Sequence, residues 1–297
     1  MSDTTAEISY IRYDVIENGI ARIVLNRPET RNAQSVRFLY ELNDAFDRAA
    51  QDDDIRVVIL AAEGPDFSSG HDLRESDKAS AMTRYETVGT WCGFGCPGVE
   101  GQMAREKEIY LGFSERWRNL PKPTIAEVQG RVIAGGLMLV WPCDLIVAAD
   151  DAKFADNTIA MGISGVEFFN HVWEVGVRRA KELLFTTRYL TAAEAERAGM
   201  VNHVVPRAEL ASFTLQLARE ISKQPLFALR LAKEAVNSAQ DAQGRATAMQ
   251  TAFALHQLCH SHNISSYSSV IHPDFVNKGW KAPELPASSA SRGITAG

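Results

Sequence analysis

The chain has 297 residues, of which 45% are hydrophobic and 23% are charged, a balance typical of a globular protein with a buried core. Its formal net charge of −6 argues against a general affinity for nucleic acid or for anionic membranes, because attraction to phosphate needs a basic surface. No apolar run approaches the roughly 18 residues of a membrane span, and the N-terminus lacks the pattern of a signal peptide, so we expect a cytoplasmic protein.

The first part of the chain alternates between strand and helix patterns. Two short strands are predicted at Ile8 to Val15 and Ile20 to Leu25, joined by a hairpin turn at Glu17-Asn18-Gly19. Apolar residues then recur at helical spacing through about Ala50, and a continuous apolar strand follows at 56–62. This order of elements is typical of an α/β protein.

Three further apolar runs continue the alternation of strands and helices, with helical candidates between them: 122–128, 145–149 and 200–205. Strands that are apolar on both faces belong to a largely buried sheet that is covered by helices. The segment between Ser76 and Asn119 has a less regular pattern, with the aromatic residues Tyr85, Trp91 and Phe94 in a glycine-rich stretch. Two interpretations stay open for it, a surface excursion between helices and a lid or pocket wall.

Beyond Pro206 the chain is predicted to be helical over 209–222, 225–238 and roughly 244–260. The end from Glu284 to Ser291 is small, polar and proline-containing, so we expect it to be mobile. These patterns predict a core at 1–206, a helical C-terminal region at 207–262 and a mostly irregular tail at 263–297.

The cysteines and histidines do not predict a metal site. Four cysteines are too few and too scattered for a disulfide scaffold or for a zinc site of usual spacing: Cys92, Cys96, Cys143 and Cys259. His256 and His260 lie four residues apart on a predicted helix, with His262 close by, but an HExxH pattern is absent. We therefore interpret these histidines as a polar helix end and expect no metal.

Two glycine-containing segments stand where apolar strands end, at 67–73 and 126–137. Two backbone N–H groups freed at such turns can converge on one oxygen and stabilise negative charge that develops there. Leu137 to Trp141 are predicted to begin a helix, whose N-terminal dipole would add positive potential. The segments together predict a backbone oxyanion hole.

Together with Asn26-Arg27-Pro28, Asn32-Ala33 and the run 143–149, these segments resemble the crotonase (enoyl-CoA hydratase/isomerase) superfamily from about Tyr10 to about Asn237. The resemblance implies a crotonase-like (ClpP/crotonase) α/β spiral of short-strand ββα units with a helical C-terminal region. It also implies a homotrimer or a hexamer of two trimers, and an acyl-CoA substrate. No metal or redox cofactor is then required, because coenzyme A enters as part of the substrate thioester.

By match to the family pattern, the donors of the hole are the N–H groups of His71 and Gly135. The side chain of His71 is unusual at this position; it either provides a pH-sensitive contact or points away from the site. The resemblance also places a group of residues beside coenzyme A: Arg27, Arg31, Ser68, Ser69, Asp72, Leu73 and Arg74.

The two glutamates that hydratases of this family use fall on Met138 and Thr158, and neither side chain titrates usefully. A substitute acid must lie nearby, and Glu167 is the first candidate for a general acid or base. Asp156 is a further candidate, with the role of a turn cap as the alternative. His171 follows Glu167 by four residues, so a helix would place the two within reach of a dyad, although a histidine paired with another carboxylate is an equal alternative.

Three functions stay open. The leading hypothesis is an acyl-CoA enzyme of the hydratase or isomerase type that stabilises a thioester enolate. The second is a thioester or carbon–carbon hydrolase in which Glu167 or His171 activates water. The third is an acyl-CoA-binding or scaffold protein without catalysis, which the residues at 138 and 158 would suit. The acyl group is not predicted.

Overall fold

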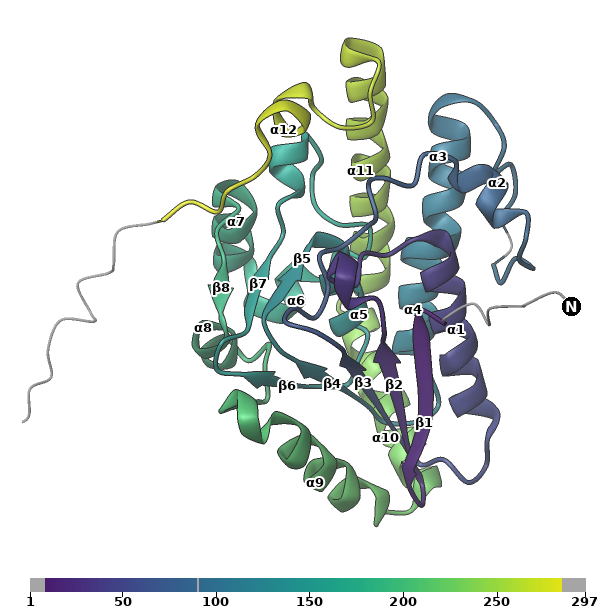
Figure 1. Ribbon diagram of the computed structural model, residues 1–297, viewed down its shortest axis with the longest axis vertical. Helices are drawn as coiled ribbons and strands as arrows, with labels where there is room; N and C mark the ends of the chain where they lie inside the picture. The colour runs from purple at the N-terminus through teal and green to yellow at the C-terminus, as the bar shows by residue number, and fades with distance from the viewer. Residues whose placement is uncertain (1–8, 90, 285–297) are drawn as a thin grey trace, which may run out of the picture.

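The computed structural model describes residues 9–89 and 91–284, and its largest feature is a six-stranded sheet in the order β1-β2-β3-β4-β6-β9 (Figure 1). β1 pairs with β2 in antiparallel fashion, and the other neighbours are parallel. The strands run as follows: β1 Ile11–Glu17, β2 Ile20–Leu25, β3 Val57–Ala62, β4 Thr124–Val128, β6 Leu145–Ala149 and β9 His203–Val205. Each strand predicted from the sequence has a counterpart among them.

Helices cover both faces of this sheet. α9 (Leu210–Ser222) packs on β2, β3, β4 and β6, where its apolar side chains meet a cluster that includes Ile59, Ile125 and Val147. α1 (Val36–Gln51) packs against β1 and β2 on the side of the larger core cluster. The side chain of Ser35 caps α1 by accepting from the Phe38 N–H. The central strands are therefore buried on both faces, as their continuous apolar runs indicate.

A second, three-stranded sheet lies beside the first and was not predicted from the sequence. Its order is β5-β7-β8, with β5 parallel to β7 and β7 antiparallel to β8. Its strands have two or three residues each, too few for a periodic pattern to be recognised. The strands and the short helices around them are β5 Arg131–Ile133, β7 Lys153–Ala155, β8 Leu190–Thr191, α5 Leu137–Val140, α6 His171–Val175, α7 Val177–Thr186 and α8 Ala192–Ala198.

The segment between β3 and β4 contains several helices that the sequence pattern did not show. It contains α2 (Lys78–Met82) and, further along the chain, α3 (Gly98–Glu106), a π-helical turn at Lys107–Gly112 and α4 (Phe113–Arg118). The last three follow one another without a break. A π-helical turn re-aims the side chains on either side of it and is frequent at functional sites. Lys78 of α2 and Gln102 and Glu106 of α3 line a cavity that is described below, so these two helices form part of its wall. Tyr85, Trp91 and Phe94 do not line that cavity.

The C-terminal helices extend further than predicted. They are α10 (Leu226–Ala242), α11 (Arg245–Tyr267) and α12 (Pro273–Lys278). The expected boundary at 262 thus falls inside α11, and the expected irregular tail contains a helix. The segment from Glu284 to Ser291, which we expected to be mobile, lies outside the described residues from 285 onward.

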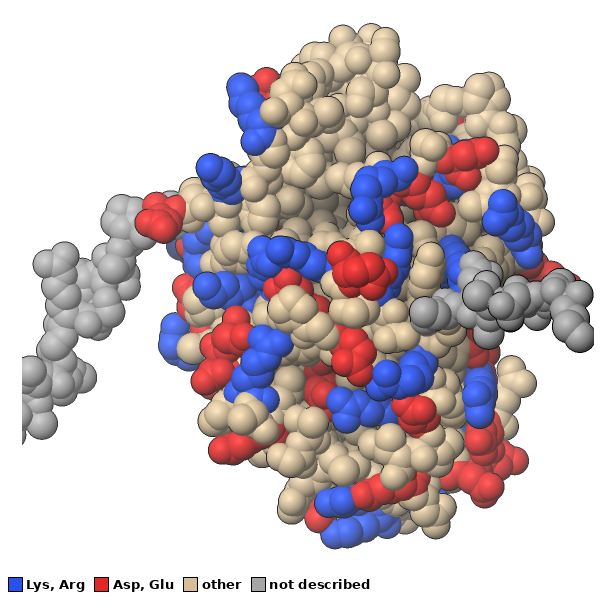
Figure 2. Space-filling view, in the orientation of Figure 1, with Lys and Arg blue, Asp and Glu red and all other residues tan. Residues whose placement is uncertain are grey.

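None of the helices in the described part of the chain has the length and apolarity to cross a membrane. Figure 2 shows acidic and basic side chains interspersed over one face of the molecule.

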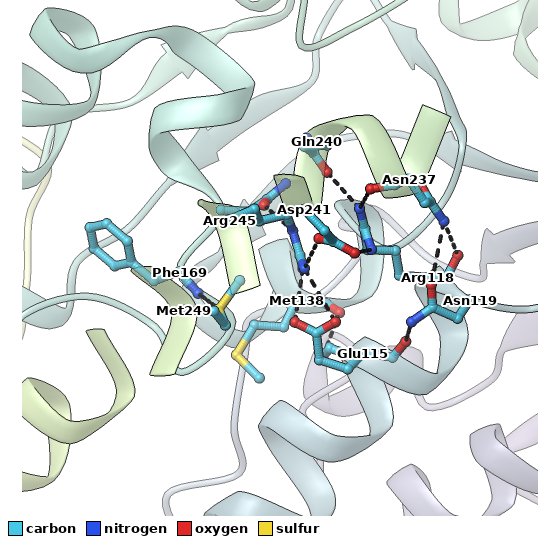
Figure 3. A network of polar contacts seen from close by, with 12 residues as sticks. Glu115, Arg118, Asn119, Met138, Phe169, Asn237, Gln240, Asp241, Arg245 and Met249 are labelled. Carbon is cyan, nitrogen blue, oxygen red and sulfur yellow. Dashed lines mark hydrogen bonds and ion pairs between the residues drawn. The ribbon is translucent and has the colours of Figure 1, made fainter. Parts of the chain in front are cut away.

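A buried arginine fixes the start of α11. Arg245 is 1% exposed, and its guanidinium group pairs with Glu115 of α4 at 2.9 Å and with Asp241 of α10 at 3.3 Å (Figure 3). It also donates to the Asn170 side chain at 3.1 Å, directly before α6. Arg118 of α4 adds a second ion pair to Asp241 at 3.1 Å. α11 is therefore held against α4 and against the segment that precedes α6.

A buried aspartate fixes the segment between β7 and α6. The Asp156 carboxylate accepts hydrogen bonds from the backbone N–H groups of Thr158 at 2.9 Å and Val166 at 3.0 Å, and from the Thr158 hydroxyl group at 2.6 Å. His171 Nε2 lies 2.9 Å from the same carboxylate. Because both ends of the segment bond to one side chain, the residues between 158 and 166 form a closed loop.

We expect Asp156→Asn to lower the free energy of unfolding at pH 7 by about 1.5–3 kcal/mol, the range for hydrogen bonds to a charged group. Burial favours the neutral acid, but His171 and Thr158 outweigh it and lower the pKa of Asp156. Because the pKa of Asp156 is lower in the folded protein than in the unfolded chain, the ionised carboxylate stabilises the fold at pH values above the unfolded pKa of about 3.9. This stabilisation is lost as the pH falls through the pKa of the folded protein. The difference between the two proteins should therefore narrow below about pH 4.

Urea denaturation at a series of pH values measures this difference. Asp54→Asn is the control, because Asp54 is exposed and should leave the stability nearly unchanged. An Asp156→Asn protein as stable as the wild type at pH 7 would show that the loop is held by other contacts.

Candidate active site

The two glycine turns predicted from the sequence lie side by side beyond the carboxyl ends of β3 and β4. The Ser68 N–H donates to the Arg131 carbonyl at 3.2 Å, and the Ile133 N–H donates to the Ser68 carbonyl at 3.0 Å. Gly70 has a φ of +88°, and a Cβ atom there would lie 2.8 Å from the Ile133 carbonyl oxygen. Glycine at position 70 thus allows the turns to approach this closely.

The N–H groups of His71 and Gly135 are free at this junction. Among the described residues, neither group donates a hydrogen bond within the protein. Gly135 lies in the first turn of a short helix, where N–H groups have no intrahelical partner. A methyl group on Gly135 would overlap the ring of His71, so glycine is required here as well.

Both residues line a cavity of ≈ 220 Å³, together with α3, the loop 157–167, α11 and α12. A larger hollow of ≈ 550 Å³ lies against α10 and β6, but neither His71 nor Gly135 lines it. The smaller cavity combines free backbone donors with buried ionisable side chains, so we place the candidate active site there.

Glu167 lies in the wall of this cavity. Its side chain is buried, with Oε1 3.9 Å from His71 Nδ1 and 3.6 Å from His256 Nε2. Burial is the main cause that raises the pKa of Glu167 to about 7, since it disfavours the charged carboxylate; His256 opposes this shift and Glu106 adds to it. The first acid predicted from the sequence therefore lies beside the two turns.

The predicted dyad between Glu167 and His171 does not form. α6 begins only at His171, so Glu167 lies before the helix and the spacing of four residues does not bring the two together. His171 pairs with Asp156, and both line a separate small cavity behind the loop. Asp156 thus has the role of a loop anchor, the alternative that the sequence left open.

Met138 and Thr158, which stand where hydratases of the resembled family have their two glutamates, differ in their surroundings. Met138 is buried in the larger core cluster, and its carbonyl group accepts from the Ser114 hydroxyl group. Thr158 lines the 220 Å³ cavity, but its hydroxyl group donates to Asp156. Neither residue supplies an acid to the site.

Sequence reasoning missed the most densely packed ionisable group in the cavity. Glu106 at the end of α3 meets His256 and His260 of α11, with Glu106 Oε2 3.5 Å from His256 Nε2 and Glu106 Oε1 3.3 Å from His260 Nε2. The Nε2 atoms of the two histidines are 3.0 Å apart. All three residues are buried. The spacing of four between the histidines was the available signal, but only the fold brings Glu106 to them.

The charges in this group depend on one another. Burial opposes a charged His256, yet the carboxylates of Glu167 and Glu106 outweigh it and raise the pKa of His256 to about 10. Burial also opposes an ionised Glu106, yet His260 and His256 hold its pKa well below the usual range. The two acidic side chains therefore favour positive charge at His256 Nε2.

The side chain of His71 points into the site and does not turn away. Its ring stacks on Tyr110 with the centroids 3.7 Å apart, and Tyr110 accepts from Lys78 Nζ at 2.7 Å. Burial, with Lys78 acting in the same direction, holds the pKa of His71 well below its ordinary value. Nε2 of the neutral ring is buried without a hydrogen-bond partner among the described residues.

Three of the residues predicted beside coenzyme A have structural contacts. Arg27 donates to Asp72 at 2.8 Å and to the Ala33 carbonyl at 2.9 Å. The Ser68 hydroxyl group is fully buried and donates to the Asn32 carbonyl at 2.9 Å. These contacts hold the first turn to the segment that precedes α1.

The other predicted coenzyme A residues lie at the cavity or beside it. Ser69 and Leu73 line the cavity, and Leu73 is exposed. The side chains of Arg31 and Arg74 are 52% and 71% exposed, with Asp66 3.5 Å from Arg31 and Asp72 3.1 Å from Arg74. Both guanidinium groups remain accessible to an anionic ligand.

Comparisons with known proteins agree with this geometry. The chain matches the family model described as Enoyl-CoA hydratase/isomerase over residues 15–90 and 98–277. The Mycobacterium tuberculosis protein EchA13, whose name includes the words enoyl-CoA hydratase, is 46% identical over 265 residues, which cover 86% of this chain and 82% of EchA13.

Solved structures show the same relationship. The structure of a probable enoyl-CoA hydratase from Mycobacterium smegmatis is similar with a TM-score of 0.81 and 48% identity, over 89% of this chain and 100% of that one. An enoyl-CoA hydratase/isomerase from Xanthobacter autotrophicus Py2 is similar with a TM-score of 0.75 and 29% identity, over 92% and 95% of the two chains. The predicted crotonase-like α/β fold is confirmed, and the chain belongs to the enoyl-CoA hydratase/isomerase family.

Proposed function

We propose that this protein is an acyl-CoA enzyme of the hydratase/isomerase type that stabilises a thioester enolate in the 220 Å³ cavity. The observation that carries the proposal is that two residues whose backbone N–H groups have no partner among the described residues line the same cavity as a buried carboxyl group. A thioester carbonyl oxygen gains negative charge when its α-carbon loses a proton, and two N–H donors stabilise that charge. His71 and Gly135 are the donors in this proposal.

Glu167 is the proposed acid and base. A carboxylate takes the proton from one carbon of the acyl group, and the resulting acid returns it to another carbon, so a single side chain suffices for an isomerisation. The position of Glu167 beside His71 supports this role, as does the absence of an acid at Met138 and Thr158. The cavity volume favours a small acyl group.

Two other outcomes are distinguishable from isomerisation. Hydrolysis would use the same hole for a tetrahedral oxyanion and would release free coenzyme A. A protein without catalysis would bind the thioester and leave it unchanged.

Replacing the acid tests the proposal. We expect Glu167→Gln to lower the rate of deuterium incorporation from deuterated water into 2-enoyl- and 3-enoyl-CoA thioesters by about 10²- to 10⁴-fold, the usual contribution of a general acid or base. Affinity for coenzyme A should be retained. Mass spectrometry of the recovered thioesters measures the exchange, and the same samples report added water and released coenzyme A.

Glu174→Gln is the matched control. Glu174 belongs to the same segment and burial raises its pKa to about 7 as well, but it lines the larger hollow and bonds to Asn170. It should keep wild-type exchange. Equal loss in both variants, or full activity in Glu167→Gln, would reject the role of Glu167, and binding without any reaction would favour the non-catalytic alternative.

We also propose that the adenosine phosphates of coenzyme A bind near Arg31 and Arg74, at the edge of the first turn. Arg31→Gln should weaken coenzyme A binding about two- to fivefold, because an exposed ion pair contributes roughly 0.5–1 kcal/mol. Calorimetric titration with coenzyme A at low salt measures this effect. Arg197→Gln, an exposed arginine on α8, should have no effect. Equal weakening by both variants would show only a general charge effect.

A self-associated state, a homotrimer or a hexamer, is the last part of the proposal. Large apolar side chains are exposed on α10 and α11, with Phe227 and Val236 each 69% and Leu258 63% exposed. Such surfaces on neighbouring helices are typical of protein interfaces. Light scattering should give about three or six times the chain mass of 32.7 kDa. A mass of one chain at micromolar concentration would contradict this expectation.

A further inference from the structure

We infer that Glu106, His256 and His260 bind one divalent transition-metal ion of the zinc type at the wall of the 220 Å³ cavity. This inference reverses the expectation from the sequence that the histidines are a polar helix end. It does not depend on the proposed acyl-CoA chemistry.

The fold brings the three side chains together from two helices that lie side by side (Figure 1). His256 and His260 lie one turn apart on α11, on the face that also carries the buried Phe253 and Asn263. Glu106 is the last residue of α3, directly before the π-helical turn. Two histidines at a spacing of four residues present their rings to one point, as in helical zinc sites of other proteins.

The distances suit one ion. The three donor atoms lie within 4.8 Å of one another. The two Nε2 atoms are 3.0 Å apart, and each faces a different oxygen of the carboxylate, His256 Nε2 at 3.5 Å from Glu106 Oε2 and His260 Nε2 at 3.3 Å from Glu106 Oε1. Zinc bonds of about 2.0–2.1 Å in a tetrahedron place neighbouring ligand atoms about 3.3–3.4 Å apart. An ion at the centre of the three side chains therefore fits with little movement.

The histidine tautomers also suit an ion. His256 Nδ1 lies 2.7 Å from the Gly165 carbonyl oxygen, and His260 Nδ1 lies 3.0 Å from the Val270 carbonyl oxygen. Because a carbonyl oxygen only accepts, each Nδ1 donates to it, and the Nε2 atom of each ring faces the other ring and Glu106. An ion that binds there takes the place of the proton that the carboxylates otherwise hold on His256 Nε2. Histidines that bind metal commonly donate their second nitrogen to a carbonyl group in this way.

The carboxylate has the corresponding outer contacts. The Gln102 side chain donates to Glu106 Oε1, and the Gln257 side chain donates to Glu106 Oε2 at 2.5 Å. Both amides are oriented so that they hold the carboxylate facing the two histidines. Each of the three proposed ligands thus has an outer partner that fixes its direction.

Protons alone do not satisfy this arrangement. One added proton on His256 Nε2 can serve one acceptor at a time, but Nε2 of His260 at 3.0 Å, Glu106 at 3.5 Å and Glu167 at 3.6 Å all surround it. The lone pair of His260 would still face the oxygen of Glu106 at 3.3 Å. A single divalent cation contacts both Nε2 atoms and Glu106 together, and its charge also offsets that of the neighbouring Glu167 in a buried space.

The site has an open side. Three protein ligands leave a fourth tetrahedral position, and Glu167 and the cavity lie next to it. Zinc sites with two histidines, one glutamate and an open position are typical of sites that take a water molecule or a ligand oxygen. Imidazole nitrogen and carboxylate oxygen, which are intermediate between hard and soft ligands, suit Zn²⁺ and Co²⁺.

Metal titration of the untagged, full-length protein tests the inference. The protein is stripped with a chelator and dialysed, then titrated with Co²⁺ while the visible absorption of the ion is followed, and with Zn²⁺ by calorimetry. We expect one ion per chain and the intense visible bands of tetrahedral Co²⁺. His260→Gln and Glu106→Gln should each weaken Zn²⁺ binding more than about tenfold, the lower bound for losing an outer partner.

His262→Gln is the matched control, because His262 is exposed on the same helix two residues beyond His260 and should leave binding unchanged. Circular dichroism checks that each variant is folded. Wild-type protein that takes up neither ion, or equal effects of His260→Gln and His262→Gln, would overturn the inference. Ion binding without thioester turnover would reject only the proposed function, and turnover by a protein that binds no ion would reject only the metal site.

Discussion

The structure of the site depends on the backbone contact between the two glycine turns. Two hydrogen bonds through Ser68 hold the turn after β3 against the turn after β4, although more than sixty residues separate them in the chain. Glycine at 70 and 135 removes the side chains that would separate these turns. Neighbouring parallel strands end at the same edge of the sheet, so the fold delivers both turns to one place. The free N–H groups of His71 and Gly135 result from this contact.

The helices that surround the turns then impose an unusual electrostatic environment. Glu106, Glu167 and two histidines are buried within a few ångströms of one another, where water screens little of their charge. Arg245 holds α11 to α4, and Asp156 closes the loop before Glu167, so these side chains are fixed from several directions. These contacts hold the ionisable side chains in the site and prevent them from turning toward solvent.

Local patterns predicted the main sheet and the two turns, whereas Glu167 was chosen through the resemblance to the family. Strands as short as β5 and β8 leave no period to recognise, and the helices between 98 and 118 contain a π-helical turn that interrupts the apolar spacing. The prediction of a dyad between Glu167 and His171 was wrong, because α6 begins only at His171 and does not include Glu167. The meeting of Glu106 with His256 joins residues 150 positions apart and depends on tertiary packing alone.

A crystal structure with a bound ketone analogue of an acyl-CoA, which keeps the carbonyl oxygen, tests the central claim most directly. The account predicts that the oxygen that stands for the thioester carbonyl lies about 2.7–3.1 Å from the backbone nitrogens of both His71 and Gly135. It also predicts that Glu167 is the nearest acidic side chain to the carbon beside that carbonyl group. An oxygen bound away from these two nitrogens, or an acyl group in the larger hollow beside α10, would contradict the account.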